Sequence, residues 1–128
     1  YHGEGIQHIA LGTDDIYGTV DGMKKAGVAF QDTIATYYDL VDKRLPRHGE
    51  NLAELKRLRI LIDGATHQGA PNELLLQIFT QTVIGPIFFE LIQRKGDEGF
   101  GEGNFRALFE SIELDQVRRG VLQDKTAA

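Results

Sequence analysis

Two neighbouring stretches near the end of the chain decide the fold: FFELIQR at Phe88–Arg94, and GFGEGNFRALF at Gly99–Phe109. The first has the pattern of an apolar strand that carries a single carboxylate, Glu90. A buried carboxylate is costly unless it is paired or bound to a metal. The second stretch is a glycine-spaced loop that leads into an amphipathic helix starting near Asn104. We therefore expect a functional site where Glu90 lies close to this loop.

Composition limits the possible partners and settings. The 128 residues are about one domain, and the net charge of −5 comes without any basic block, which argues against a nucleic-acid partner. The pairs Lys24–Lys25 and Arg118–Arg119 are isolated and typical of solvated helix faces. The chain has no cysteine, which excludes disulfides and thiolate metal sites and favours the reducing cytoplasm. No apolar run approaches the roughly 18 residues of a membrane helix, so we expect no membrane partner.

The beginning of the sequence suggests a longer protein. The only methionine is Met23, and the chain opens at Tyr1. We therefore expect that these residues are a piece of a larger chain. An open sheet of about four strands would also need a second module to cover its apolar residues and its edges.

Hydrophobic periodicity predicts an α+β order of elements. Thr13–Asp15 offers N-caps for a helix that contains Ile16, Val20 and Met23 and stops at Gly27. The predicted strands span 6–11, 28–30, 59–62, 73–80 and 87–94. The predicted helices span 16–26, 37–45, 52–58 and a closing segment from Asn104, whose apolar stripe is Phe105, Leu108, Phe109 and Ile112. The order is β-α-β, an inserted helical segment, three strands and a closing helix.

Five motifs occur in an order that resembles the C-terminal portion of 4-hydroxyphenylpyruvate dioxygenase, within the vicinal oxygen chelate fold. They are Gly5–Ala10, Thr36–Tyr38, Leu75–Phe79, Phe88–Arg94 and Gly99–Phe105. The resemblance implies a βαβββ module with an inserted helical segment and a C-terminal lid helix, which pairs with a second module in a larger barrel. It covers residues 1–122 as the iron-binding module, and we expect 123–128 to be a disordered tail.

The same resemblance implies an Fe(II) site held by two histidines and one glutamate. It places one histidine at His8 and the glutamate at Glu90, and it leaves the other histidine to the upstream module. Two imidazoles and a carboxylate on one face of the metal leave three adjacent positions open. On the residues alone, a strand histidine such as His8 is more often a hydrogen-bonded core residue. His2, His48 and His67 lie in loop-like segments and are expected to be exposed and without function.

The resemblance also implies a set of residues around the substrate. Gln77 would lie beside the substrate and dioxygen and take part in catalysis, and its amide adds no charge to the metal. The expected substrate-binding residues are Gln77, Phe79, Phe100, Asn104 and Phe105, and Gln7 is expected behind the ligands. Core packing of the phenylalanines and a plain N-cap role for Asn104 remain open alternatives.

The glycines of the loop are not a nucleotide-binding fingerprint. Gly99, Gly101 and Gly103 alternate, but the strand–GxGxxG–helix order of such a site is missing. We expect instead a loop that needs unusual backbone dihedrals and carries a lid helix over the cavity, which would exclude water.

The implied function is an Fe(II)-dependent dioxygenase. It would convert 4-hydroxyphenylpyruvate and O2 to homogentisate and CO2 in tyrosine and phenylalanine catabolism, as a cytoplasmic homo-oligomer. The isolated chain is expected to be inactive, because it holds two of the three ligands. Two alternatives stay open: 4-hydroxymandelate synthase, and a non-catalytic vicinal oxygen chelate module that binds a small ligand or a partner chain.

Overall fold

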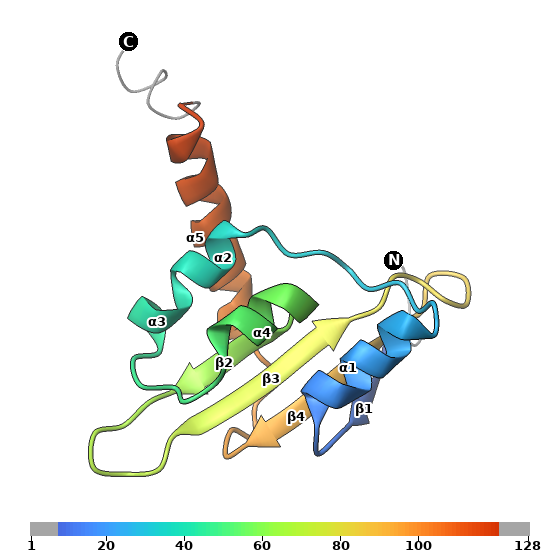
Figure 1. The fold of residues 1–128 in the computed structure, drawn as a ribbon, viewed down its shortest axis with the longest axis horizontal. Coiled ribbons are helices and arrows are strands. Elements are labelled where there is room, and N and C mark those ends of the chain that lie inside the picture. The colour runs from blue at the N-terminus through green and yellow to red at the C-terminus, as the bar shows by residue number, and fades with distance from the viewer. Residues whose placement is uncertain (1–7, 121–128) are drawn as a thin grey trace, which may run out of the picture.

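Residues 8–120, which the computed structural model describes, form an α+β fold on one four-stranded sheet (Figure 1). Within the sheet, β1 pairs in parallel with β4, whereas the β4–β3 and β3–β2 pairs are antiparallel. The sheet is therefore mixed, with the order β1-β4-β3-β2. The strands are β1 (His8–Gly12), β2 (Leu61–Ala65), β3 (Glu73–Phe79) and β4 (Phe88–Lys95).

The helices fall into three groups along the chain. The first, α1, follows β1, and three short helices then precede β2 as an inserted segment. The last, α5, stands beside α2 and rises away from the sheet (Figure 1). The order β-α, inserted helices, β-β-β and closing helix confirms the predicted α+β class. The helices are α1 (Ile16–Lys25), α2 (Thr36–Asp39), α3 (Val41–Arg44), α4 (Leu52–Leu58) and α5 (Gly103–Arg118).

The ends of α1 follow from its sequence, as predicted. The N-cap is Asp15, whose Oδ1 accepts the backbone N–H of Gly18 at 3.1 Å. After the last turn, Gly27 takes a φ of 96°, and the N–H of Val28 donates to the carbonyl of Met23 at 3.0 Å. This is a Schellman ending, in which a glycine adopts the left-handed conformation that other residues avoid.

The core lies on one face of the sheet only. Alternate residues of β3 point into it, as the period of two along a strand requires, and α1, α2, α3 and α4 supply the opposite side. Its most deeply buried apolar side chains include Ile16, Val20, Tyr37, Val41, Leu55, Leu58, Ile60, Ile62 and Leu76. The other alternate residues of β3 and β4 face away from this core, and they carry the polar candidates of the sequence analysis.

The predicted strand at 28–30 is wrong. In the structure, Phe30 forms only an isolated antiparallel bridge with Thr80. The N–H of Gln31 donates to the carbonyl of Phe79 at 2.8 Å, so the segment touches just the end of β3. A ladder of this length is too short to make a strand.

Two further boundaries differ from the prediction. The helix expected at 37–45 is split at Leu40, whose N–H bonds to the carbonyl of Tyr37 at 3.3 Å in a tighter, three-residue turn. The strand expected at 59–62 starts two residues later, at Leu61. Arg59 takes a φ of 60° as the C-cap of α4, and the N–H of Ile60 bonds back to Leu55 at 2.9 Å. Arg59 and Ile60, which were expected to begin the strand, therefore form the C-terminal cap of α4.

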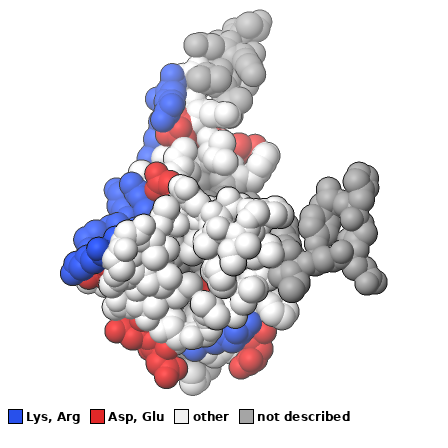
Figure 2. Space-filling view, turned by 90° about the vertical axis from the view of Figure 1, so that its right-hand side faces the viewer, with Lys and Arg blue, Asp and Glu red and all other residues white. Residues whose placement is uncertain are grey.

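The side of the molecule near α1 and β1 is largely uncharged in its middle (Figure 2). Lys and Arg gather along the left edge of this view, and the bottom carries Asp and Glu with Lys or Arg between them (Figure 2). Large apolar side chains are exposed on the edge strand β1, at Ile9 and Leu11, and in the β3–β4 connection, at Val83 and Ile84. Among residues 8–120, no helix combines the length and the apolar character needed to cross a membrane.

Gly64 should be essential for the pairing of β2 with β3. Its φ is 124°, and a Cβ there would overlap the carbonyl oxygen of Glu73. We predict that Gly64→Ala lowers the free energy of unfolding by about 1–3 kcal/mol from backbone strain alone. Denaturant unfolding monitored by circular dichroism measures this. The matched control is Gly22→Ala in α1, where a Cβ meets nothing within 4 Å and the helix should gain ~0.5–1 kcal/mol. Equal stability of the two variants would contradict the prediction.

Candidate functional site

A cavity of about 630 Å³ lies on the sheet face opposite the core. Strands β1, β3 and β4 form its floor, and the loop before α5 together with the first turns of that helix forms its wall. The structure brings together in this cavity every predicted site residue that it describes, namely His8, Gln77, Phe79, Glu90, Phe100, Asn104 and Phe105. Gln7 lies outside the described residues. The lining also includes Gln31, Leu61, Phe88, Gly101, Glu102 and Leu108.

His8 and Glu90 meet across the parallel β1–β4 pair. The register sets Ala10 beside Glu90, and the Nε2 of His8 lies 3.4 Å from the Oε1 of Glu90. The Glu90 side chain is 6% exposed, whereas that of His8 is 37% exposed. The imidazole stacks on the Phe88 ring, with centroids 5.2 Å apart and planes at 8°. The strand pattern suggested that His8 lies in the core. Instead it lies at the rim of the sheet, because β1 is an edge strand.

These two side chains offer one imidazole and one carboxylate. Within residues 8–120, no group of three or more His, Cys, Asp or Glu side chains is placed to hold a metal ion. The pair nevertheless fits two thirds of a two-histidine, one-carboxylate iron site. Its donor atoms face each other in the cavity, and within residues 8–120 the buried Glu90 carboxylate contacts His8 and Gln77 and pairs with no lysine or arginine.

Gln77 occupies the second oxygen of Glu90. Its Nε2 donates to the Oε2 of Glu90 at 2.7 Å and to the carbonyl of Phe100 at 3.3 Å. Its Oε1 accepts the Nδ2 of Asn104 at 2.7 Å. The whole amide of Gln77, which is 1% exposed, is thus used in hydrogen bonds, as a buried polar group requires.

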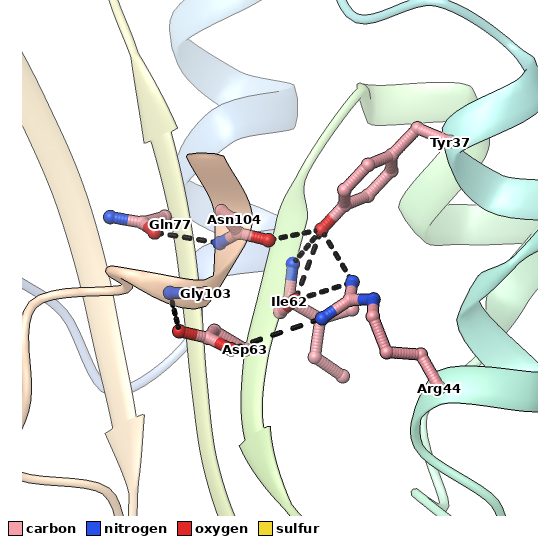
Figure 3. Close-up of polar contacts among 7 residues, drawn as sticks. All are labelled: Tyr37, Arg44, Ile62, Asp63, Gln77, Gly103 and Asn104. Atoms are coloured by element: carbon pink, nitrogen blue, oxygen red, sulfur yellow. Dashed lines mark hydrogen bonds and ion pairs between the residues drawn. The ribbon is translucent and has the colours of Figure 1, made fainter. Parts of the chain in front are cut away.

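Asn104 belongs to the site and does not cap α5. The N-cap of that helix is Glu102, which makes no side-chain capping bond, so the capping alternative for Asn104 is wrong. Asn104 is 3% exposed and points toward Gln77 (Figure 3). The N–H of Gly103, at the helix start, donates instead to the Oδ2 of Asp63 in β2 at 2.9 Å (Figure 3).

The glycine loop reaches the site at Gly101. This residue has a φ of 78°, and a Cβ on it would overlap the amide oxygen of Gln77. The predicted need for unusual backbone dihedrals in the loop is confirmed at this position. The loop therefore passes directly over the Gln77 amide, which only a glycine allows.

The aromatic side chains differ in how well they are covered. Phe79 packs edge-to-face on Phe88, with ring centroids 5.8 Å apart at 81°. Phe100 and Phe105 line the cavity but are 72% and 79% exposed. The predicted apolar stripe of α5 also faces outward at Phe109, because the helix buries Asn104, Ala107 and Ser111 instead.

Sequence reasoning missed the residues behind the site. Tyr37, Arg44 and Asp63 lie close to Asn104 and the start of α5 (Figure 3). Burial raises the pKa of Tyr37, so its hydroxyl keeps its proton. A signal existed for Asp63, which is the one charged residue of the strand LIDGA. Gln31, which lines the cavity, carried none.

The predicted exposure is wrong for His48 and confirmed for His67. His48 is buried, its Nε2 lies 2.7 Å from the Oδ1 of Asp42, and its Nδ1 accepts the N–H of Glu50 at 2.9 Å. It therefore orders the turn after α3. His67 is exposed in a loop. His2 lies outside the described residues.

Comparison with known proteins gives the same relationship. No protein-family model matches the chain. A 4-hydroxyphenylpyruvate dioxygenase from Pseudomonas aeruginosa is 65% identical over 122 residues, which are 95% of this chain and 33% of that protein. The chain is homologous to 4-hydroxyphenylpyruvate dioxygenase. The Hemolysin VllY of Vibrio vulnificus is 64% identical over 124 residues, 97% of this chain and 34% of that protein.

A solved structure of a related enzyme has a similar fold. A triple mutant of 4-hydroxymandelate synthase from Streptomyces coelicolor superimposes with a TM-score of 0.65 at 37% identity, over 88% of this chain and 31% of that one. The chain spans about a third of the length of the curated relatives it matches.

The close approach of the loop to Gln77 gives a prediction. Gly101→Ala should push the Gln77 amide away from Glu90, and its positive φ should cost about 1–3 kcal/mol of stability. The measurements are denaturant unfolding and the NMR signals of the Gln77 side-chain NH2. Gly99→Ala is the control, because a Cβ there meets only flexible side-chain ends of Asp97 and Glu102, at 3.0 and 3.1 Å. Unmoved Gln77 signals in Gly101→Ala would contradict this account of the loop.

Proposed function

We propose that this chain forms the iron-binding part of a dioxygenase that converts 4-hydroxyphenylpyruvate and O2 to homogentisate and CO2. The main support is that His8 and Glu90, which are far apart in the sequence, face each other at 3.4 Å in a cavity of about 630 Å³. The chain is homologous to 4-hydroxyphenylpyruvate dioxygenases over about a third of their length, and this homology supports the choice of reaction.

In this proposal, His8 and Glu90 hold an Fe(II) ion, and a histidine from outside this chain completes the set. When bound, the iron supplies the redox chemistry that activates dioxygen. The third ligand would come from an upstream module, which would pair with this βαβββ unit, residues 1–122, in the barrel of the vicinal oxygen chelate fold. Such pairing would also cover the apolar side chains that the sheet edge leaves exposed.

The other cavity residues would bind and orient the substrate. The Phe79–Phe88 pair presents an aromatic wall against which the substrate ring can pack. Gln77 and Asn104 offer neutral amides, which position polar groups without changing the charge of the site. Phe100 and Phe105, exposed at the mouth, would cover the bound substrate with the start of α5 and exclude water. The proposed setting is tyrosine and phenylalanine catabolism in the cytoplasm, as a homo-oligomer.

A second candidate is 4-hydroxymandelate synthase. The superposition with that enzyme, with a TM-score of 0.65, supports it. Both reactions would use the same ligands, so product analysis separates them. We use a chimera in which this chain replaces the matching third of the Pseudomonas aeruginosa enzyme. We expect homogentisate from 4-hydroxyphenylpyruvate, and 4-hydroxymandelate as the main product would favour the second candidate.

Removing the carboxylate of Glu90 should remove the metal. In the chimera, we predict that Glu90→Ala abolishes nearly all Fe(II) retention and turnover, because the only anionic ligand is lost. Glu90→Gln should be almost as damaging, because it keeps the shape but not the charge. Bound iron after anaerobic gel filtration and oxygen uptake measure the two effects.

The control for this pair of variants is Glu73→Gln. Glu73 is an exposed carboxylate on the same strand as Gln77, so its loss should leave both readouts unchanged. If Glu90→Ala binds Fe(II) with unchanged affinity and still turns over, Glu90 is not a ligand. A wild-type chimera that folds but binds no iron would favour the non-catalytic module.

The chain alone should behave differently from the chimera. Because it supplies two of the three proposed ligands, we predict weak Fe(II) binding and no oxygen uptake with 4-hydroxyphenylpyruvate. We also predict self-association through its exposed apolar side chains. Isothermal titration with Fe(II) under anaerobic conditions and analytical ultracentrifugation test both points. Tight stoichiometric iron binding by the isolated chain would refute the need for an outside ligand.

A further inference from the structure

A chain of buried hydrogen bonds runs from the inserted helices to the carboxylate of Glu90. It starts at the hydroxyl of Tyr37 in α2, which donates to the Oδ1 of Asn104 at 2.5 Å (Figure 3). Asn104 donates through Nδ2 to the Oε1 of Gln77, and Gln77 donates through Nε2 to the Oε2 of Glu90, each at 2.7 Å. All four residues are at most 5% exposed.

The direction of this series of hydrogen bonds, from donor to acceptor, is set at Tyr37. The Tyr37 oxygen accepts the N–H of Ile62 at 2.9 Å and the Nη2 of Arg44 at 3.1 Å (Figure 3). These two donors occupy its lone pairs, so its single hydrogen must point elsewhere. Two acceptors lie within reach of this hydrogen: the Ile62 carbonyl at 3.0 Å, which also receives Arg44 Nη2, and the Asn104 Oδ1, which is closer at 2.5 Å. The Tyr37 hydrogen therefore goes to Asn104, whose Oδ1 must face the tyrosine.

Each amide then fixes the next one. With its oxygen turned to Tyr37, Asn104 presents its NH2 to Gln77, so the Gln77 oxygen must face Asn104. The Gln77 NH2 is left to face two acceptors, the carboxylate of Glu90 and the carbonyl of Phe100. Reversing any member would set oxygen against oxygen in a buried place, which is costly.

We propose that Tyr37 is a positioning residue that, through Asn104 and Gln77, decides which oxygen of Glu90 is free. Gln77 occupies Oε2, whereas Oε1 faces His8 at 3.4 Å. The hydroxyl of Tyr37 thus reserves Oε1 for the side of the cavity where His8 lies. The part of this inference that concerns iron rests on the proposed function, whereas the orientation of the amides stands on the hydrogen bonds alone.

The chain contains a matched control for Tyr37. Tyr38 is its neighbour and is 2% exposed against 1% for Tyr37, and its hydroxyl donates to the backbone carbonyl of Ile60 at 3.0 Å. Its hydroxyl has no bond to Asn104 or Gln77 among the described contacts. Tyr37→Phe and Tyr38→Phe therefore remove the same group from the same core, and only the first should disturb the amides.

The test has two readouts. In the 128-residue chain, the side-chain NH2 signals of Gln77 and Asn104 are followed by NMR. They should shift in Tyr37→Phe and remain in place in Tyr38→Phe. In the chimera described above, anaerobic titration with Fe(II) alone should show a roughly tenfold weaker affinity for Tyr37→Phe, the size expected when a partner behind a ligand is lost, and no change for Tyr38→Phe.

A second variant covers the case in which Tyr37→Phe does not fold. Asn104→Asp keeps an acceptor for Tyr37 but has no NH2 for Gln77, so it breaks the next bond and should move the Gln77 signals in the same way. Gln77 signals that do not move in either folded variant overturn the inference, and so does an unchanged Fe(II) affinity in Tyr37→Phe. Shifted signals in the 128-residue chain, together with a wild-type chimera that binds no Fe(II), support the amide orientation and refute the proposed function.

Discussion

The carboxylate of Glu90 is the constraint on which the site depends. It lies in β4, an inner strand, with its side chain 6% exposed, and no lysine or arginine neutralises it among the described contacts. A buried charge must find hydrogen bonds or a counter-charge. One oxygen accepts a hydrogen bond from the amide of Gln77, and the other faces the imidazole of His8. The glycine at position 101 and the buried start of α5 both follow from the need to hold that amide in place.

The architecture separates stability from chemistry. The apolar core occupies one face of the sheet, under α1 and α4, and the cavity occupies the other. Strand alternation achieves this, because neighbouring residues of β3 serve opposite faces. Leu76 and Ile78 hold the core, whereas Gln77 and Phe79 line the cavity. The inserted helices are the exception, because Tyr37 belongs to the core and also contacts Asn104.

Much of this could be predicted from the sequence, and the failures have physical causes. Periodicity located α1, α4, β3 and β4, because strong amphipathic patterns reflect burial directly. It also located α5, although Phe105, Phe109 and Ile112 of the apolar stripe of that helix are exposed. The strand at 28–30 failed because three residues with suitable propensity found only the end of β3 to pair with. The late start of β2 depends on a left-handed C-cap at Arg59, a position where glycine is the usual signal. His48 looked exposed because its partner Asp42 becomes visible only in the folded turn.

The candidate site residues, which line one cavity, were predicted from motif order and not from spacing. Nothing in the separation of His8 from Glu90 predicts that they meet, since the parallel pairing of β1 with β4 brings them together only in three dimensions. Tyr37, Arg44 and Asp63 were missed for the opposite reason. A tyrosine among apolar residues has the pattern of a core residue, and the role of its hydroxyl is visible only once Arg44, Ile62 and Asn104 are placed around it.

His8 and Glu90 lie on strands that are held in the sheet to different extents. Among the described strands, β1 is held by β4 alone, whereas β4 is held on both sides. Edge strands open by local fluctuations that cost far less free energy than global unfolding, and their amides exchange hydrogen correspondingly faster. The imidazole of His8 can therefore leave the cavity while the carboxylate stays, and anything held between them would escape at the fraying rate of β1 and not at the rate at which the domain unfolds.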